Sequence, residues 1–125
     1  MRPLEDITVI DCTQALIGPL ATQILGDFGA DVIKVERPET GDLTRNFATR
    51  YEDFSAYFTS LNRNKRSLTL DMTTDSGQRV LKELAAEADV FIHNFSPGKA
   101  EAFDAEYETL REVNDQLLYC GLSGY

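Results

Sequence analysis

The stretch that decides the fold is Ile7-Thr8-Val9-Ile10-Asp11-Cys12, together with Asp31-Val32-Ile33-Lys34-Val35-Glu36 further along the chain. Both segments are β-branched or apolar at nearly every position, which is typical of strands buried on both faces of a parallel sheet. Between them, Gly18-Pro19 can open a helix and Gly29 can end it. The apolar positions of that helix recur at helical spacing, which predicts that they form the face packed on the sheet: Leu20, Ala21, Ile24, Leu25 and Phe28. The segment therefore predicts a strand, a helix and a parallel strand.

The same alternation continues to the end of the sequence. It predicts a short helix at 54–61, a strand at 66–71, a helix capped by Thr73-Thr74-Asp75, strands at 90–93 and 117–121, and a short helix at 107–113. Residues 39–53 form a long polar excursion of the kind kept for function or partner contact. The pattern predicts an α/β fold, a Rossmann-like, mostly parallel sheet with helices on both faces. No helical pattern covers the last strand, so we expect the domain to be incomplete without more chain or a partner subunit.

Length and charge exclude several classes of function. A chain of 125 residues predicts one domain, spanning 1–125. Its 12 Lys and Arg against 21 Asp and Glu give a net charge of -9, which opposes binding to nucleic acid or an anionic membrane. The apolar runs are far shorter than the roughly 20 residues of a membrane span, and no signal-type apolar stretch follows Met1. We therefore expect a cytoplasmic protein that binds neither nucleic acid nor membrane.

The sequence offers no convincing nucleophile or metal site. Cys12 and Cys120 lie in strand-like runs without a CxxC pattern, which predicts two buried, reduced thiols. His93 is the one histidine, and a lone imidazole after an apolar run is more typical of packing than of a general base. Carboxylate pairs, a Ser-His-Asp set and metal-ligand spacing are all lacking. We expect no bound metal.

Ligands of an open parallel sheet collect where its strands end, so the loops after Asp11, Glu36, Asp71 and His93 are expected to form one site. The only basic cluster is Arg63-Asn64-Lys65-Arg66. Beside Lys34 and Arg37, this cluster could hold the phosphates of a nucleotide, although a solvated surface cluster is the simpler alternative.

A second candidate for a phosphate and base site is the segment from His93 to Lys99, which has an aromatic ring, two bends and a lysine. Glu36 stands where a dinucleotide fold places its ribose-binding acid, but the GxGxxG fingerprint is missing. This absence counts against a dinucleotide-dependent oxidoreductase.

Several motifs in the same order resemble the class III coenzyme A transferases. That family includes formyl-CoA, carnitine-type and succinyl-CoA transferases, with α-methylacyl-CoA racemase as a sister branch. The resemblance covers essentially the whole chain, and its motifs are Gly18-Pro19, 25–36, Gly41-Asp42, 62–68, Leu70-Asp71 and 94–98.

The resemblance implies a CoA-binding, Rossmann-like half of an enzyme that moves CoA between an acyl-CoA and a small carboxylic acid. In that family an aspartate carries the acyl group, and full-length subunits form an interlocked homodimer. The family's aspartate lies beyond the equivalent of Tyr125, so the resemblance implies that the isolated chain is inactive.

The resemblance also implies which residues contact CoA. Ala15, Leu16 and Ile17 correspond to the wall near the thioester, and Arg37 with Pro38 to the contact with adenine and phosphate. The adenine side corresponds to Leu70 through Met72, and the pantetheine and phosphate side to Asn94, Phe95 and Lys99. Lys99 stands in for a basic residue that some members have near the position of Ala102.

Two positions bear on the type of reaction. The oxalate-processing branch has glutamine where this chain has Leu16, which speaks against formyl-CoA:oxalate transfer. Asn64 stands where the racemase branch tends to have glycine, which favours a transferase over a racemase. A CoA- or nucleotide-binding module without chemistry is the alternative from a different functional class.

Overall fold

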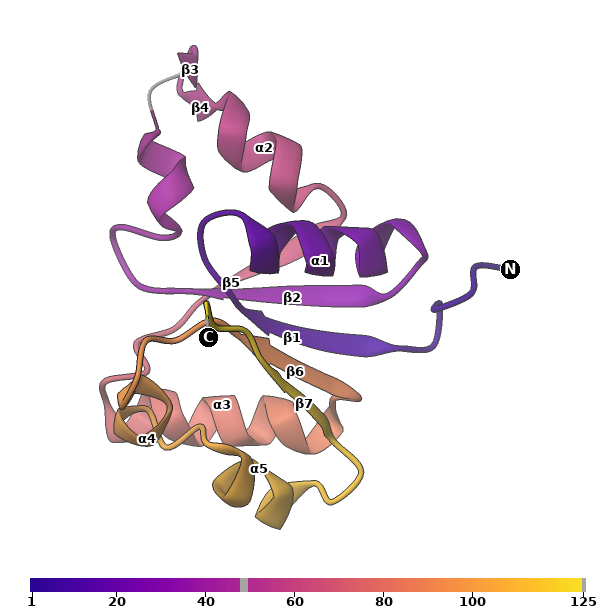
Figure 1. Ribbon diagram of the computed structural model, residues 1–125, viewed down its shortest axis with the longest axis vertical. Helices are drawn as coiled ribbons and strands as arrows, with labels where there is room; N and C mark the ends of the chain where they lie inside the picture. Colours follow the sequence, from indigo (N-terminus) through magenta and orange to yellow (C-terminus); the bar gives the residue numbers. More distant parts are fainter. Residues whose placement is uncertain (48–49, 125) are drawn as a thin grey trace.

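Five parallel strands form the centre of the structure, in the spatial order β5-β2-β1-β6-β7 (Figure 1). The structure is a computed structural model that describes residues 1–47 and 50–124. The strands are β1 (Thr8–Cys12), β2 (Asp31–Glu36), β5 (Lys65–Thr69), β6 (Val90–His93) and β7 (Leu118–Gly121). From β1 the chain builds outward to β2 and β5, then returns to the other side of β1 for β6 and β7. The strand order therefore reverses between β1 and β6, at the position where such sheets bind ligands.

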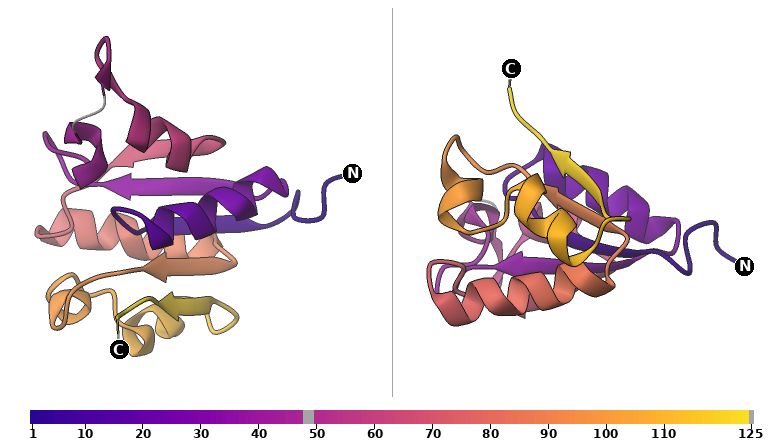
Figure 2. Two further views of the ribbon diagram at one scale, coloured as in Figure 1. Left: turned by 45° about the horizontal axis from the view of Figure 1, so that its top comes forward. Right: turned by 90° about the horizontal axis from the view of Figure 1, so that it is seen from below.

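Helices cover both faces of the sheet, as the alternation in the sequence predicts (Figures 1 and 2). On one face lie α1 (Ile17–Asp27) and α2 (Ala56–Asn62), and on the other lie α3 (Asp75–Glu87) and α5 (Tyr107–Val113). The short α4 (Lys99–Ala102) follows β6. No helix in the described part of the chain has the length and apolar character needed to cross a membrane. The prediction of an α/β fold is confirmed.

The larger hydrophobic core lies between the sheet and the helices α3 and α5. Its fully buried members include Ile10, Leu81, Phe91 and Leu110. The core on the α1 face is smaller and consists of Val9, Ala30, Val32 and Ile92, with partly buried neighbours. Burying each such side chain stabilises the fold by about 1.5–3 kcal/mol. The sheet is therefore anchored mainly from the α3 side.

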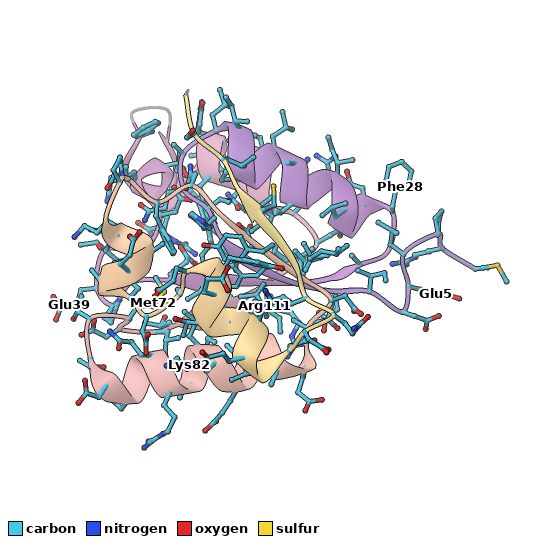
Figure 3. The ribbon with its side chains drawn as sticks, turned by 60° about the horizontal axis from the view of Figure 1, so that its bottom comes forward. Glu5, Phe28, Glu39, Met72, Lys82 and Arg111 are labelled. Carbon is cyan, nitrogen blue, oxygen red and sulfur yellow. The ribbon has the colours of Figure 1, made fainter. Side chains whose placement is uncertain are left out.

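Helix α1 buries only part of the face that the apolar spacing predicts: Leu25 packs against the smaller core and Ala21 is half-buried. Leu20, Ile24 and Phe28 are 41%, 46% and 52% exposed, and Phe28 points away from the sheet in Figure 3. The buried residues are small or polar, namely Gly18, Pro19, Thr22, Gln23 and Gly26. The Thr22 hydroxyl donates a 2.6 Å hydrogen bond to the Asp11 carboxylate at the end of β1, which turns this side of the helix inward.

The polar excursion contains short elements that the sequence does not predict. They are the 3-10 helix η1 (Leu43–Asn46) and the hairpin strands β3 (Arg50–Tyr51) and β4 (Phe54–Ser55). The helix predicted over 54–61 therefore starts later, because Ser55 is its N-cap and accepts from the Phe58 amide at 3.2 Å. Residues 48–49 of the excursion lie outside the described residues.

Strand β7 forms one edge of the sheet and is covered on one side only. Tyr119 packs against the larger core, whereas Leu118 is 67% exposed and Cys120 is exposed. Cys12 is buried and both thiols are free. The prediction of buried thiols is thus right for Cys12 and wrong for Cys120, because alternate side chains of an edge strand face outward.

Candidate functional site

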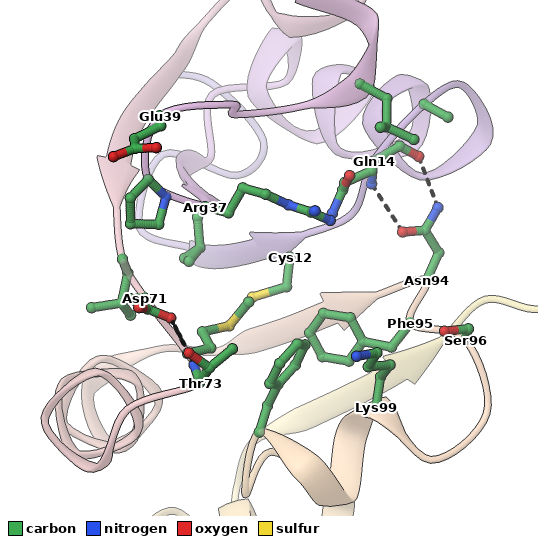
Figure 4. Close-up of a pocket in the computed structure, with 17 residues that line it drawn as sticks. Cys12, Gln14, Arg37, Glu39, Asp71, Thr73, Asn94, Phe95, Ser96 and Lys99 are labelled. Atoms are coloured by element: carbon green, nitrogen blue, oxygen red, sulfur yellow. Dashed lines mark hydrogen bonds between the residues drawn. The ribbon is translucent and has the colours of Figure 1, made fainter.

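A cleft of about 740 Å³ lies at the carboxyl ends of β1, β2, β5 and β6 (Figure 4). Figure 3 shows Glu39 and Met72 near this end of the sheet and Phe28 at the opposite end. The lining residues come from the loops after all four strands, as expected for a sheet whose strand order reverses here. The prediction that the loops after Asp11, Glu36, Asp71 and His93 converge is confirmed by this arrangement.

Arg37 and Lys99 bring positive charge to the cleft. Arg37 follows the end of β2 and extends over the cleft in the direction of Gln14, while Lys99 begins α4 on the other side (Figure 4). Both side chains line the cleft and both residues are exposed. Among the ion pairs between described residues, none involves either cation. Their charges are therefore available to an anionic ligand such as a phosphate.

Apolar and aromatic side chains form the remaining walls of the cleft. Phe95 stacks on the His93 ring at 4.6 Å and meets the Phe103 ring edge-to-face at 5.2 Å. Leu70 and Met72 enter from the end of β5. A wall of this kind with a few cations is suited to a ligand that combines a flat base, phosphates and an apolar chain.

His93 supports the wall of the cleft through contacts at both of its ring nitrogens. Its Nδ1 accepts the Phe95 amide at 3.1 Å, so the proton lies on Nε2, which is 2.8 Å from the Tyr119 hydroxyl. That hydroxyl donates to the Ala105 carbonyl at 3.0 Å. Burial lowers the pKa of His93, with a smaller opposing effect from Glu101, and burial raises the pKa of Tyr119 to about 12. Both groups are neutral at pH 7, which agrees with the predicted packing role.

Asn94 holds the loop that follows β1. Its carboxamide donates to the Gln14 carbonyl at 2.8 Å and accepts from the Gln14 amide at 2.9 Å (Figure 4). The pair replaces the two hydrogen bonds that a neighbouring strand would make. Asn94 therefore joins the end of β6 to the end of β1 across the point where the strand order reverses.

The cleft contains no activated thiol. Cys12 lines it, but burial raises the pKa of this thiol and the neighbouring Asp11 raises it further. A neutral buried thiol is a poor nucleophile. Within the described residues, no group of three His, Cys, Asp or Glu side chains has the geometry of a metal site.

The basic cluster lies away from the cleft, so its proposed phosphate role is corrected. Arg63 pairs with Asp27, and Arg66 pairs with Asp31. Lys65 is buried against Asp11 at 3.0 Å, where burial lowers its pKa. None of the three lines the cleft.

Two other charged strand residues are also held within the fold. Lys34 is buried against Asp42. Glu36 is buried too: burial alone would raise its pKa, but hydrogen bonds from Arg45, the Asp42 amide and Ser67 lower it to about 2. Neither side chain lines the cleft, so Glu36 does not serve as a ribose-binding acid there.

Most of the predicted site residues meet in the cleft. The lining includes Ala15, Arg37, Pro38, Leu70, Met72, Asn94, Phe95 and Lys99. Leu16 and Ile17 do not line it and are 45% and 72% exposed, because α1 begins by turning them outward.

The prediction missed further lining residues, namely Cys12, Gln14, Val35, Glu39, Leu43, Thr73, Ser96 and Phe103. Gln14, Thr73 and Ser96 are each next to a predicted site residue in the sequence, and this could have indicated that they line the cleft. Phe103 had no such signal, since the intervening helix α4 was not predicted.

Comparisons with known proteins agree with this geometry. A family model described as CoA-transferase family III matches residues 4–125. The Homo sapiens protein "Succinyl-CoA:glutarate CoA-transferase" is 44% identical over 126 residues, covering 100% of this chain and 29% of that protein. The Escherichia coli O6:H1 protein "Formyl-CoA:oxalate CoA-transferase" is 43% identical over 124 residues, covering 98% of this chain and 30% of that protein.

A solved structure of a CAIB/BAIF family protein from Brucella suis matches with a TM-score of 0.92 and 43% identity, over 99% of this chain and 34% of that one. The chain thus spans about a third of the length of the relatives it matches. The match to the family model extends over nearly every residue, and the chain therefore belongs to CoA-transferase family III.

Proposed function

We propose that this chain is the CoA-binding, N-terminal part of an enzyme that transfers CoA between an acyl-CoA and a small carboxylic acid. The observation that supports this most is that Arg37 and Lys99, which form no ion pair with any described residue, line one cleft with an aromatic wall. CoA combines phosphates, a base and a long thiol-ended arm, which are the groups such a cleft suits. Family membership supplies the reaction class.

The proposed orientation of CoA follows the chemistry of the walls. Its phosphates lie between Arg37 with Pro38 and Lys99, and its adenine lies against Leu70 and Met72. The pantetheine arm passes Phe95 and Asn94, so that the thioester reaches Ala15. This order places charged groups of the ligand at the exposed cations and its arm along the half-buried side chains of Phe95 and Asn94.

We propose that the nucleophile is an aspartate located after residue 125. The acids that line the cleft are Glu39 and Asp71. Asp71 accepts hydrogen bonds from the Thr73 hydroxyl and amide at 2.6 and 3.0 Å, which lower its pKa, and it lies on the adenine side. A carboxylate fixed as a turn acceptor at that end is poorly placed to reach a thioester. The position of the nucleophile therefore agrees with the shortness of the chain relative to its relatives.

The proposed reaction requires neither an oxidant nor a metal. A carboxylate oxygen attacks the acyl-CoA carbonyl, the C–S bond breaks, and an anhydride and the CoA thiolate result. The thiolate then attacks the aspartyl carbonyl, which releases the donor acid and leaves an aspartyl-CoA thioester. The acceptor carboxylate then attacks this thioester, which gives a second anhydride and releases the CoA thiolate. The thiolate attacks the acceptor's carbonyl, which forms the new acyl-CoA and restores the aspartate. No metal is required at any step.

We propose succinyl-CoA as the donor, with a dicarboxylic acid such as glutarate as acceptor. The name of the human relative gives this pair. Leu16 offers no amide where the oxalate-processing branch has glutamine, which disfavours oxalate as acceptor.

We further propose a cytoplasmic, interlocked homodimer in the protein at its full natural length. Exposed apolar side chains on α1 and β7, such as Ile24 and Leu118, support burial of that face by further chain or a partner subunit.

Calorimetric titration and a transfer assay on the full-length protein test the proposal. We expect CoA to bind and NAD not to bind, and we expect glutarate with succinyl-CoA to yield glutaryl-CoA and succinate, measured by chromatography. Binding of CoA without any turnover over a panel of acids would favour a non-catalytic module. Preferential binding of NAD would contradict the proposal.

A further inference from the structure

We infer that the buried pair Lys34 and Asp42 acts as a positioning device for the thioester end of the proposed site. It does so by fixing the backbone of the β1–α1 loop, which we define as residues 13–16. This inference rests on the proposed function for its catalytic consequence. The claim that the pair fixes the backbone of this loop does not depend on the proposed function.

Side chains from outside the β1–α1 loop hold successive backbone groups of this loop. Lys34 donates to the Thr13 carbonyl at 2.8 Å, and Asp42 accepts the Ala15 amide at 3.3 Å. Asn94 holds both backbone groups of Gln14. Asp11 accepts the Thr13 amide at 2.9 Å. The loop thus has an externally imposed path, with few backbone groups left to water.

Lys34 and Asp42 themselves are deeply buried. Each residue is 1% exposed, and Lys34 Nζ lies 2.8 Å from Asp42 Oδ2. The other carboxylate oxygen accepts from the Thr44 amide and hydroxyl at 2.9 and 2.8 Å. A buried ion pair often contributes little net stability compared with apolar residues of the same size. Its presence in the core of this chain is therefore better explained by the geometry that it imposes.

The backbone at Ala15 shows what that geometry achieves. Ala15 has φ of 69°, in the left-handed region that a residue with a Cβ rarely adopts. Such a conformation persists only where surrounding groups fix it, and here the fixing groups are Asp42, Lys34 and Asn94. Ala15 lines the cleft at the end proposed for the thioester. Asp42 also caps η1, whose Leu43 lines the same cleft, so one carboxylate sets two of its walls.

The test uses the double substitution Lys34→Met and Asp42→Asn in the full-length protein, which leaves no lone buried charge. The matched control is Arg66→Met with Asp31→Asn, which removes an exposed ion pair between β5 and β2. A thermal melt followed by circular dichroism confirms that both variants fold. We expect kcat of the test variant to fall by about 100-fold, as for a misplaced reacting group, while the control retains wild-type kcat.

Binding separates positioning from a general loss of structure. We expect the test variant to bind adenosine 3′,5′-bisphosphate, which fills only the Arg37 end, as tightly as the wild type does, while its KM for acyl-CoA rises. Equal losses for both ligands, or an unchanged kcat, would overturn the inference.

Hydrogen exchange makes the inference testable even if the proposed function fails. In the wild type we expect the amides of Gln14 and Ala15 to be protected, and in the test variant to lose that protection, while α3 stays protected in both. A loop already unprotected in the wild type would overturn the inference without involving CoA. A protected loop in a protein that binds no CoA would instead contradict the proposed function.

Discussion

Arg37 is the residue whose removal most directly changes the charge of the cleft. The Arg37→Ala substitution deletes a charge-assisted contact to phosphate, and we expect it to weaken CoA binding by about 1–3 kcal/mol, measured by calorimetry. Arg66→Ala is the control, because Arg66 is also exposed but pairs with Asp31 outside the cleft. Wild-type affinity in Arg37→Ala would remove Arg37 from the site.

His93 links the stability of the fold to pH. Burial lowers its pKa below the ordinary value of 6.5, so the unfolded chain binds a proton more readily than the folded one. We therefore expect the contribution of His93 to the free energy of unfolding to be fully present above pH 6.5 and to decrease as the pH falls below that value. Urea unfolding at about pH 7.5 and about pH 5.5 measures the change across the range in which an imidazole titrates.

The matched variant for this prediction is His93→Phe, which keeps a ring against Phe95 but cannot titrate. We expect it to be less stable than the wild type at neutral pH, because it loses the bonds to the Phe95 amide and Tyr119. We also expect its stability to vary less over the same pH interval. An equal pH dependence in both proteins would show that other groups cause the effect.

At the residue scale, the local sequence predicts which residues lie at the cleft better than it predicts which charged residues form ion pairs. Arg37 and Lys99 follow the ends of strands or their loops, and parallel strands bring such positions to one edge. Lys65 looks like a surface cation in its basic run, yet it is buried against Asp11. Ion pairs between strands depend on which strands are neighbours, which a local pattern does not contain.

At the element scale, helix α1 shows why apolar spacing alone can mislead. Leu20 and Ile24 of its apolar stripe are exposed, while Gly18, Thr22 and Gly26 recur every fourth residue on the face that packs. Small residues at this spacing allow a helix to approach a sheet closely. The small-residue stripe was the better predictor here, because the end of β1 offers a hydrogen-bonding carboxylate in place of an apolar surface.

The close approach of α1 leads to a prediction for Gly18. A Cβ at this position would lie 2.3 Å from Thr13 Cβ, so Gly18→Ala forces the helix away from the loop. We expect a loss of about 1–3 kcal/mol in the free energy of unfolding, measured by denaturant titration. Gly124→Ala is the control, since no heavy atom lies within 4 Å of its added Cβ. Equal stability of the two variants would contradict this packing.

The strands of the main sheet and the helices α3 and α5 were predictable, whereas the hairpin β3–β4 and the helix α4 were not. The predicted ranges 31–36, 90–93 and 107–113 coincide with β2, β6 and α5. The hairpin β3–β4 and helix α4 contain few residues, too few to show a period. The 3-10 helix η1, which is equally short, makes a tertiary contact that no local pattern contains, the cation–π contact of its Arg45 with Phe58 of α2 at 3.8 Å.

At the scale of the whole molecule, the strand order explains where the site lies. The order reverses between β1 and β6, and the cleft extends from this point across the ends of β2 and β5. The alternation in the sequence predicts such a sheet and its binding edge. It does not predict which side chains turn into the cleft, since Leu16 and Ile17 turn away from it as α1 begins.

The central claim is that this edge of the sheet binds CoA with its phosphates between Arg37 and Lys99. A crystal structure of the full-length protein grown with CoA tests it most directly. We predict phosphate density within hydrogen-bond distance of both cations, adenine against Leu70 and Met72, and the thiol arm directed toward Ala15. Density for the nucleotide on any other surface, with this cleft filled only by water, would contradict the claim.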